Sequence, residues 1–489
     1  MTQLKWNFAA LIIIFVLVSC SSRPISAAPW QDTKTDLPVE QTVTSVPDDQ
    51  EFRQIMDAAD VPGLSIARIE NSQVVWSRKF GRRAAMDEAV TATLIDAETV
   101  FEAASLGKPL VAIAALWLHD RSRLDLDESA DAIVPYSILD DPRKTLITPR
   151  MLMSHTSGLA FSQPKLDAEP GSRYYYSTEG YRYLQRIVEK RLDESLEQWA
   201  QTTLFGPLKM ERTSFVFAER FHENRATGRN WLDRGQEYMT NAAGTGAFDL
   251  VTTADDYAKL WAGVLRGDVL SPKSLRQMFT PQKPITSSQS DPLVPKTQSV
   301  ELAAGLGLLL QKQDTRWLGF QWGDNGGSMG FLLVDPERRD AVVFLSNAQD
   351  GGYAGQAIVA AAGMTDQAME WLGYDAYDSP ARVAWKQITR KMNVDLKGGL
   401  AEYQRLLKED KATVASLSRN LGYYNKFRGD VAEAEPFYRI AVEQNPNDAD
   451  LYEVWAESLK ASGQVDAAAK ALKRAETLKA SRAEGKTPE

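Results

Sequence analysis

A serine and a lysine stand three residues apart at the start of an apolar segment. The segment Ser105–Lys108 reads SLGK, and Pro109 and the apolar run 110–118 follow it. If that run is helical, the two side chains lie on one face, one turn apart. A neutral serine is a poor nucleophile, but a lysine whose pKa is lowered by burial can accept its proton. The positive end of the helix would stabilise negative charge that develops near Ser105. The pair therefore predicts nucleophilic catalysis, and a capping serine followed by a solvated lysine is the alternative.

Length, composition and charge set the broad class of the protein. The chain has 489 residues, which predicts about three domains rather than a single core. Its hydrophobic content of 44% and charged content of 25% are those of a soluble globular protein. The net charge of −9 argues against nucleic-acid binding. Three histidines and one cysteine argue against a His/Cys metal site and exclude a disulfide within the chain. No metal or other cofactor is therefore expected.

The N-terminus has the pattern of a bacterial lipoprotein signal. Residues 8–18 are continuously apolar, a run shorter than the roughly 20 residues that span a bilayer but suited to a secretory signal. Residues 17–20 read LVSC, which resembles a lipobox, where cleavage precedes the cysteine and lipid is attached to it. A plain secretory signal that is cut near Ala27 is the alternative. We predict that Cys20 is lipidated and anchors the protein in the bacterial cell envelope, facing the periplasm or in the outer membrane.

The elements around the serine and lysine predict a sheet that is assembled from distant parts of the chain. Residues 61–77 read as two short strands, and residues 340–347 read as another strand. Helices are predicted between them, after Ser105, at 150–154 and at 181–190. Strands at both ends with helices between them indicate a sheet that carries a helical insert.

Several short motifs occur in order within residues 51–362. They are VPGL at 61–64, FEAASLGKP at 101–109, SHTSGL at 154–159, LFGPL at 204–208 with Met210, the segment 244–256 with TTADD at its end, and AGLG at 304–307. Together they resemble the serine beta-lactamase and penicillin-binding-protein superfamily, in the branch that contains class C beta-lactamases, D-alanyl-D-alanine carboxypeptidases and esterases. The resemblance implies an α/β (α+β) fold, in which helices flank an antiparallel sheet and form a helical subdomain. It also implies acyl-enzyme chemistry at Ser105.

A tyrosine-rich segment resembles the second reactive element of that family. Residues 170–181 read PGSRYYYSTEGY, and alignment with the family's P-G-x-x-aromatic-x-Y-S-N-x-G-Y selects Tyr176 among three tyrosines. A phenol beside Lys108 can have its pKa lowered and can act as a general base or proton relay. Thr178 stands where the family has asparagine, and it offers one hydroxyl instead of a donor and an acceptor. We expect a weaker or different orientation of the substrate there.

A glycine-rich segment resembles the strand that carries K-T-G or H-x-G in that family. Residues 322–331 read WGDNGGSMGF, and Asn325 is assigned to the cationic or imidazole position. A neutral asparagine can only hydrogen-bond, which argues against beta-lactams and terminal carboxylates and favours neutral esters or amides. One backbone N–H of this segment is expected to complete an oxyanion hole with that of Ser105. The predicted substrate-binding residues are Thr178, Asn325, Gly326, Gly327 and Ser328.

The predicted catalytic residues are Ser105, Lys108 and Tyr176. Ser105 would attack a carbonyl while the other two share its proton, and water would release the acyl group. No base analogous to the class A glutamate is identified, so Tyr176 would have to activate that water. A Ser-His-Asp triad through His155 is the alternative, and a structural histidine at a helix end is favoured over it.

The chain from Lys411 onward has the tetratricopeptide period. Gly429 and Gly463 lie 34 residues apart, as do two pairs of alanines. Two repeats are fewer than the roughly three that form a stable stack, and helices within 380–408 are expected to supply the missing layer. A peptide-binding groove and a helical appendage that packs on the hydrolase domain both remain open. The predicted divisions are a signal peptide at 1–19, a tether at 20–50, a hydrolase domain at 51–362, a helical connector at 363–410, two repeats at 411–482 and a tail at 483–489.

Two classes of function follow from these observations. The first is an envelope serine hydrolase that acts on an ester, a peptide or a beta-lactam-like amide. The second is a lipid-anchored binding or scaffold protein that kept the fold and lost turnover, as Thr178 and Asn325 suggest. The expected partners are a small-molecule or peptide substrate, a membrane through the lipid, and a protein bound by the C-terminal repeats, but no nucleic acid.

Overall fold

The structure is a computed structural model that describes residues 48–84, 93–236, 244–288 and 300–483. The predicted signal peptide, the predicted lipid site Cys20 and nearly all of the predicted tether lie outside the described residues. Within the described ranges, no helix has both the length and the apolar character needed to cross a membrane. The predictions about the N-terminus therefore stay predictions.

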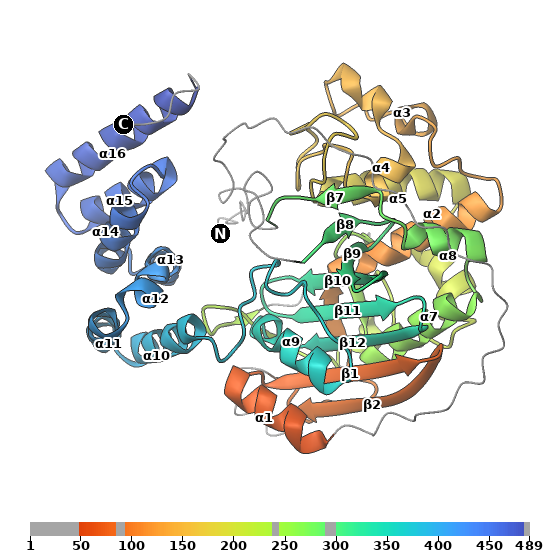
Figure 1. Cartoon of the computed structure of the whole chain (residues 1–489), viewed down its shortest axis with the longest axis horizontal. Coiled ribbons are helices and arrows are strands. Elements are labelled where there is room, and N and C mark those ends of the chain that lie inside the picture. Colours follow the sequence, from red (N-terminus) through yellow and green to blue (C-terminus); the bar gives the residue numbers. More distant parts are fainter. Residues whose placement is uncertain (1–47, 85–92, 237–243, 289–299, 484–489) are drawn as a thin grey trace.

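An eight-stranded antiparallel sheet lies at the centre of the fold (Figure 1). In spatial order the strands are β2 (Gln73–Gly81), β1 (Gly63–Glu70), β12 (Asp340–Ser346), β11 (Met329–Asp335), β10 (Arg316–Asp324), β9 (Leu309–Gln313), β8 (Leu302–Ala304) and β7 (Lys283–Ile285). The first strand of the chain pairs with the last, with Leu64 opposite Ser346. The predicted fold class, with a sheet built from distant segments and helices around it, is confirmed.

The two faces of this sheet belong to two separate cores. Along β12, Val343 and Leu345 point into one core, whereas Val342 and Phe344 point into the other, because successive side chains of a strand alternate between faces. Helices α1 (Asp49–Ala59) and α9 (Gly351–Ala361) cover the face of Val342 and Phe344. The opposite face packs on α7 (Ala254–Arg266) and on the helical subdomain. Sequence analysis did not predict α1.

The helical subdomain positions the serine and the tyrosine. Its helices gather at the upper right of Figure 1. They are α2 (Lys108–Asp120), α3 (Ala130–Ile133), α4 (Pro149–Met153), α5 (Thr178–Leu192), α6 (Leu196–Ala200) and α8 (Pro272–Met278), with short turns at η1 (Ser105–Gly107), η2 (Pro142–Leu146) and η3 (Gln201–Phe205). A further turn, η4 (Glu219–Phe221), packs its Phe221 against Val100 and Val251. Helix α2 packs against α5, and α4 packs against α5. The tightly packed α2 is apolar on nearly every side, since ten of its residues are buried.

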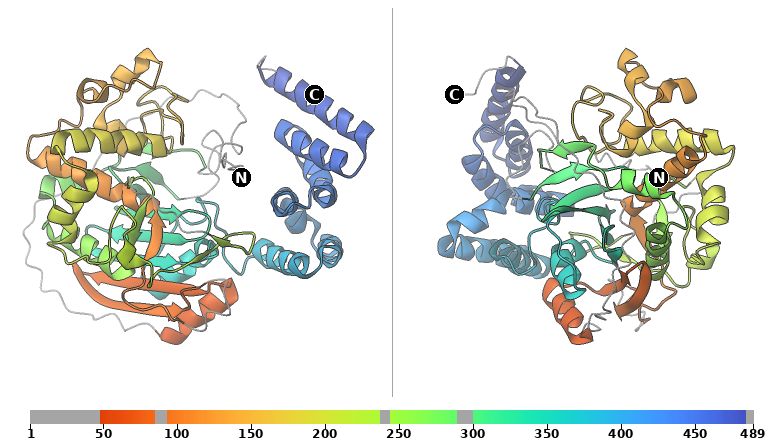
Figure 2. Two further views of the ribbon diagram at one scale, coloured as in Figure 1. Left: turned by 180° about the vertical axis from the view of Figure 1, so that it is seen from behind. Right: turned by 45° about the vertical axis from the view of Figure 1, so that its right-hand side comes forward.

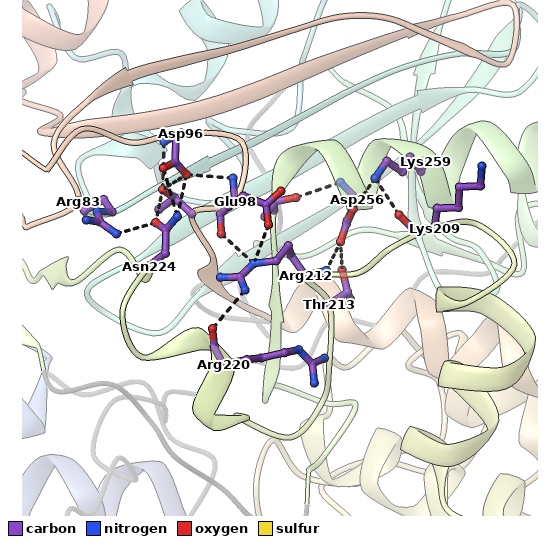
Figure 3. Close-up of polar contacts among 12 residues, drawn as sticks. Arg83, Asp96, Glu98, Lys209, Arg212, Thr213, Arg220, Asn224, Asp256 and Lys259 are labelled. Atoms are coloured by element: carbon purple, nitrogen blue, oxygen red, sulfur yellow. Dashed lines mark hydrogen bonds and ion pairs between the residues drawn. The ribbon is translucent and has the colours of Figure 1, made fainter.

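A polar network fixes the short strand that precedes Ser105. Strand β3 (Phe101–Ala104) pairs with β6 (Leu250–Thr252), and β6 leads into α7. Arg212 bridges the surrounding segments, because its guanidinium donates to the carbonyls of Glu98 and Arg220 (3.0 and 3.2 Å) (Figure 3). The buried carboxylate of Asp256 accepts from the Arg212 N–H and from the Thr213 hydroxyl (2.8 and 3.1 Å). The TTADD motif, which ends at Asp256, is therefore structural in this part of the fold.

Seven helices follow the sheet and extend from it as an arm (Figures 1 and 2). They are α10 (Pro380–Val394), α11 (Leu396–Glu409), α12 (Lys411–Ser416), α13 (Ser418–Arg428), α14 (Glu435–Gln444), α15 (Ala449–Ala461) and α16 (Val465–Ala483), with a turn η5 (Ala432–Ala434) before α14. Helix α10 shares a core with α11 to α14, and Trp231 and Leu232 of the first part of the chain pack against that core. The predicted helical character of this region is confirmed, whereas its assignment as tetratricopeptide repeats stays a prediction.

Local packing explains the unusual residues of the predicted repeats. Gly429 ends α13 with a φ of 95°, a left-handed conformation that favours glycine. A side chain at Gly422 would lie 2.6 Å from the Tyr438 ring. Pro436 stands in the first turn of α14, where its missing N–H costs nothing. Asn425 is buried, and its side-chain amide donates to the carbonyl of Leu421 (2.8 Å).

Candidate active site

Ser105 stands at a tight turn between a strand and a helix. Strand β3 ends at Ala104, η1 begins at Ser105, and α2 follows from Lys108. Ala104 has a φ of 45° and a ψ of −123°, a conformation that is unfavourable for a residue with a Cβ atom and that concentrates at functional sites. Ser105 is partly exposed while its neighbours Ala104 and Leu106 are buried. The turn therefore presents the serine hydroxyl to solvent and to a substrate.

Glycines allow the surrounding backbone to approach this turn. An added Cβ at Gly107 would lie 2.3 Å from the carbonyl oxygen of Gly246. A Cβ at Gly323 would lie 2.0 Å from the carbonyl oxygen of Ala103, and one at Gly330 would lie 2.7 Å from Leu106 Cδ1. Gly323 and Gly330 face each other in the β10–β11 pair. The glycine in SLGK and those of the WGDNGGSMGF segment are thus needed for close packing around Ser105.

Lys108 is completely buried and in contact with the serine. Its Nζ donates to Ser105 Oγ over 2.8 Å and to the carbonyl oxygen of Ala247 over 2.7 Å. Burial and, to a smaller extent, the charge of Arg182 lower the pKa of Lys108 to about 7. A large fraction of this amine is therefore uncharged near neutral pH and able to accept a proton.

Tyr176 completes the group, as sequence analysis predicted for its position. Its hydroxyl is hydrogen-bonded to Ser105 and accepts a hydrogen bond from Gln321 Nε2 at 3.3 Å. Lys108 Nζ lies 5.0 Å from the centre of the Tyr176 ring. The structure thus brings together the alcohol, the amine and the phenol. The expected lowering of the phenol pKa is wrong, because burial raises the pKa of Tyr176 to about 12.

His155 supports Tyr176 and does not replace it. The imidazole stacks on the phenol with ring centres 4.3 Å apart, and its Nδ1 accepts from the Ser177 N–H at 3.0 Å. Burial and the charge of Lys108 hold the pKa of His155 well below its usual value. This uncharged, fully buried ring fits the structural role that was favoured over a catalytic triad.

The predicted substrate-binding residues lie on two sides of this group. Thr178 is the first residue of α5 and is largely buried, and its N–H donates to the carbonyl of Phe161 (2.8 Å). Asn325 to Ser328 form the turn between β10 and β11. Asn325 Oδ1 accepts from the N–H groups of Gly327 and Ser328 (3.1 and 2.8 Å). These two amides are therefore already bonded within the turn.

The Gly326 amide and the other polar groups of Asn325 are also hydrogen-bonded within the protein. The Gly326 N–H donates to Asp324 Oδ1 at 2.7 Å. Asn325 Nδ2 donates to Glu102 Oε2 at 2.7 Å, and its carbonyl accepts from Gln236 Nε2 at 2.7 Å. In this conformation none of the three amides of Gly326, Gly327 and Ser328 is available as the expected second donor of an oxyanion hole. Their contact with substrate stays a prediction. It requires the Asn325 side chain to leave the amides of Gly327 and Ser328, or the Asp324 side chain to leave that of Gly326.

Two residues that hold the site in place were not found by sequence analysis. Gln185 of α5 is buried, donates to the Gly244 carbonyl (3.2 Å) and accepts from the Gly246 N–H (2.9 Å). It thereby positions the next residue, Ala247, whose carbonyl binds Lys108. Glu102 is an acid in the otherwise apolar strand FEAA, three residues before Ser105. That buried acid was the one visible signal in the sequence, whereas Gln185 gave none.

No metal centre is found in the part of the chain that the structure describes. No group of three or more His, Cys, Asp or Glu side chains in those residues is arranged to hold an ion.

Comparison with known proteins places this chain in a family. The sequence matches the family described as Beta-lactamase over residues 49–363. It is 24% identical to "Acyltransferase mokF" of Monascus pilosus and 25% identical to "Monacolin J acid methylbutanoyltransferase" of Aspergillus terreus, in both cases over 289 residues, which are 47% of this chain and 69% of the relative. It is 25% identical to "Protein flp" of Staphylococcus aureus over 178 residues, 32% of this chain and 35% of that protein.

Solved structures show the same fold. An octameric penicillin-binding protein homologue from Pyrococcus abyssi superposes with a TM-score of 0.55 and 23% identity, and the match covers 70% of this chain and 80% of that chain. A class C beta-lactamase superposes with a TM-score of 0.53 and 18% identity over 65% of this chain and 96% of that chain. At these identities the likeness establishes the architecture alone.

Proposed function

This chain belongs to the beta-lactamase family, and from that premise we propose that it is a serine hydrolase that forms an acyl-enzyme on Ser105. The observation that carries the proposal is the 2.8 Å contact between Ser105 Oγ and Lys108 Nζ, made by a lysine with no exposed surface. A buried lysine without a carboxylate partner is costly to a fold. Its position against a partly exposed serine at a strained turn supports a catalytic role.

The proposed reaction begins with transfer of the Ser105 proton to uncharged Lys108. Ser105 Oγ then forms a bond to the substrate carbonyl carbon, and negative charge develops on the carbonyl oxygen. We assign stabilisation of that charge to the Ser105 N–H, which lies at the start of η1 and next to the positive end of α2. Collapse of the intermediate breaks the bond to the leaving group, which takes a proton from Lys108 directly or through Tyr176.

The second half of the reaction restores the serine. A water molecule attacks the acyl carbon and gives up a proton to Lys108, either directly or relayed through the Tyr176 hydroxyl. The acyl–Oγ bond then breaks and Ser105 recovers its proton. Because burial raises the pKa of Tyr176 to about 12, the phenol enters each half as a protonated relay and not as a phenolate.

The walls of the site favour a neutral substrate with an apolar group. The ring centre of Trp322 lies 4.9 Å from that of Tyr176, and the ring centre of Phe161, which is 47% exposed, lies at 6.1 Å. Asn325 is neutral, and its side-chain amide is bonded to Glu102 and to the turn. We therefore propose an ester with an apolar acyl group as the substrate class, ahead of a beta-lactam or a D-alanyl-D-alanine peptide.

Acyl transfer to an alcohol is the second candidate. The names of the two fungal relatives describe transferases, one of them for a methylbutanoyl group. Hydrolysis and transfer share the same acyl-enzyme and differ only in whether water or an alcohol attacks it. Product analysis in the presence of added alcohols distinguishes the two.

We also propose that the protein acts at the cell envelope, held by lipid on Cys20. Support comes from the apolar run 8–18 and the sequence LVSC at 17–20. Metabolic labelling with a palmitate analogue tests this point. Label is expected on the wild-type protein and not on Cys20→Ser, and a wild-type protein without label would rule out the lipid anchor. A protein partner for the C-terminal helices remains part of the proposal.

Active-site labelling tests the proposed function directly. A fluorophosphonate probe is expected to label the wild-type protein and not Ser105→Ala. A fluorescent penicillin serves as a second probe, with weaker labelling expected because the site lacks a free cation at Asn325. If neither probe labels the folded wild-type protein, the chain is a binding or scaffold protein that has kept the fold without turnover.

A further inference from the structure

Gln321 lies beside the candidate active site on β10, and no step of the proposed reaction uses it. The residue is almost completely buried, with 1% exposed. Its side-chain nitrogen Nε2 lies 2.9 Å from the carbonyl oxygen of Trp322 and 3.3 Å from the hydroxyl oxygen of Tyr176. A buried amide thus contacts the phenol that is itself hydrogen-bonded to Ser105.

The Trp322 carbonyl fixes which end of the amide faces Tyr176. A carbonyl oxygen only accepts hydrogen bonds, so the amide atom 2.9 Å away from it has to be the donor, Nε2. If the amide were turned over, two oxygens would face each other at that distance with no proton between them. The NH₂ group has a second proton, which is the one available to Tyr176. Gln321 therefore donates to the phenol oxygen and does not accept from it.

This donor determines where the phenol proton can go. A tyrosine hydroxyl carries a single proton. With Gln321 donating to the oxygen, that proton is directed to the other partner, Ser105. The ring itself is already held, because it packs on the rings of His155 and Trp322 with centres 4.3 and 4.9 Å away. Rotation of the O–H group is the freedom that remains, and Gln321 restricts it.

A second carbonyl fixes the other end of this chain of hydrogen bonds. Lys108 Nζ lies 2.7 Å from the carbonyl oxygen of Ala247 and 2.8 Å from Ser105 Oγ. Since the carbonyl can only accept, an uncharged Lys108 uses a proton there and can turn its lone pair to Ser105. Every donor then points the same way, from Gln321 through Tyr176 and Ser105 to Lys108. Hydrogen bonds in such a chain polarise one another.

We propose that Gln321 is a positioning residue that makes Tyr176 the proton donor to the leaving group. The inference rests on the proposed acyl-enzyme chemistry and assigns one proton transfer within it. The phenol proton is directed to the side of Ser105, where the leaving oxygen departs once Oγ has bonded to the carbonyl carbon. A side chain that accepted from the phenol would turn this proton away from the reacting atoms.

The protons balance over the acylation step. Ser105 gives its proton to uncharged Lys108 as Oγ bonds to the carbonyl carbon. When the bond from that carbon to the leaving oxygen breaks, Tyr176 gives its proton to that oxygen, and Gln321 stabilises the phenolate by its hydrogen bond. The Lys108 ammonium, 5.0 Å from the centre of the phenol ring, then returns a proton to the phenol oxygen. Both groups thereby regain their starting states.

The dependence of the rate on the leaving group tests this role. Ethyl butyrate releases an alkoxide that has to be protonated, whereas p-nitrophenyl butyrate releases an anion that is stable without a proton. Both esters transfer the same acyl group. Gln321→Met keeps the length of the side chain and removes its donor. It is expected to lower kcat/KM for the ethyl ester about tenfold or more, and that for the p-nitrophenyl ester less than about twofold.

Two further variants show whether Gln321 acts through the phenol. Tyr176→Phe is expected to give the same selective loss as Gln321→Met, and the double variant is expected to lose no more than Tyr176→Phe alone. Gln321→Glu keeps the shape of the side chain but offers the phenol an acceptor. The same selective loss is expected from it, and it takes the place of Gln321→Met if that variant does not fold.

Gln311→Met is the matched control. Gln311 stands on the neighbouring strand β9, is equally buried with 1% exposed, and bonds to Asp366 and Gln367 instead. Its replacement removes a buried amide without touching the phenol. The ratio of kcat/KM between the two esters is therefore expected to stay that of the wild type.

Each of four outcomes would overturn the proposal: equal losses for both esters, unchanged rates for both, a selective loss in Gln311→Met, or losses that multiply in the double variant. Fluorophosphonate labelling separates these from a failure of the proposed function. The fluoride of the probe leaves as an anion, so Gln321→Met is expected to be labelled like the wild type. With a labelled wild type, any of the four outcomes refutes the role of Gln321 alone. A wild type with neither labelling nor turnover refutes the acyl-enzyme as well.

Discussion

Asn325 Nδ2 donates a hydrogen bond to Glu102 Oε2 over 2.7 Å, although 223 positions of sequence separate the two residues. The bond ties strand β3, which precedes Ser105, to the turn between β10 and β11. On the other side, the Asn325 carbonyl accepts from Gln236, and the Arg229 N–H donates to the Gly327 carbonyl (3.1 Å). The hairpin of β4 (Gly228–Arg229) and β5 (Gly235–Gln236) therefore supports the same turn from behind. One wall of the candidate active site thus depends on hydrogen bonds between three distant segments.

The first prediction concerns this tie. Glu102→Ala is expected to lower the free energy of unfolding by about 1–3 kcal/mol, because it leaves the Asn325 amide unpaired in a largely buried place. It is also expected to lower kcat for a p-nitrophenyl ester about tenfold, because the turn loses its fixed position. Glu102→Gln keeps an acceptor oxygen and is the matched control with a smaller loss of both. Urea unfolding and steady-state kinetics measure the two effects. Unchanged kcat in Glu102→Ala would show that the turn does not contribute to catalysis.

The second prediction concerns the pH dependence of acylation. The pKa of Lys108 is lowered to about 7, and only its uncharged form accepts the Ser105 proton. The rate of acylation is therefore expected to rise with pH through about 7 and to level off above it. Tyr176, with a pKa raised to about 12, stays protonated over this range and adds no second step. The pH profile of kcat/KM for an activated ester measures this, and a flat profile between pH 6 and 8 would exclude Lys108 as the base.

A third prediction follows from the cost of burying the same lysine. The unfolded chain holds this proton up to the usual lysine pKa of 10.5, whereas the folded chain releases it near 7. The unfolded state therefore binds more protons between these values, and the wild-type protein gains stability as pH rises through this window. Lys108→Met has no such group. Its Tm is expected to exceed that of the wild type at pH 7, and the difference is expected to shrink toward pH 10. Thermal scans at both pH values measure it, and a Tm for Lys108→Met below wild type at pH 7 would contradict it.

Sequence patterns predicted the central elements of the site but not their electrostatics. The spacing of Ser105 and Lys108, together with the family motif around Tyr176, was enough to predict that these three side chains lie close together. The sign of the Tyr176 pKa shift was not predictable, because it depends on burial beneath His155 and Trp322, which come from other segments. The hydrogen bonds that hold the side-chain amide and the main-chain carbonyl of Asn325 likewise depend on other segments, which contribute Glu102 and Gln236. Hydrogen bonds across such separations leave no local pattern in a single sequence.

The fourth prediction concerns the apolar wall of the site. Phe161 is 47% exposed beside Tyr176, so its ring is available to an apolar acyl group. Phe161→Ala is expected to lower kcat/KM for octanoyl or benzoyl esters about tenfold, because burial of several methylene groups is lost. Acetyl esters, which are too short to reach the ring, are expected to change little. Val394→Ala, 90% exposed on α10, is the control. An equal loss for long and short esters would show that Phe161 acts on the site as a whole and not on the acyl group.

The last prediction concerns the contact between the C-terminal helices and the sheet. Asp350 is buried at the start of α9, and it pairs with Arg229 of the β4–β5 hairpin and with Arg382 of α10. Removing one member of a buried ion pair leaves the others uncompensated, which costs about 3–5 kcal/mol. Asp350→Ala is therefore expected to loosen α10 and to expose the segment 363–380 to protease.

Asp268→Ala breaks an exposed pair with Arg266 (2.6 Å), and as the control it is expected to change stability by less than about 1 kcal/mol. Limited proteolysis and urea unfolding compare the two variants. Equal protease resistance would mean that aromatic packing around Trp231 alone holds the helices in place, since Trp231 joins the α10 core without any charge.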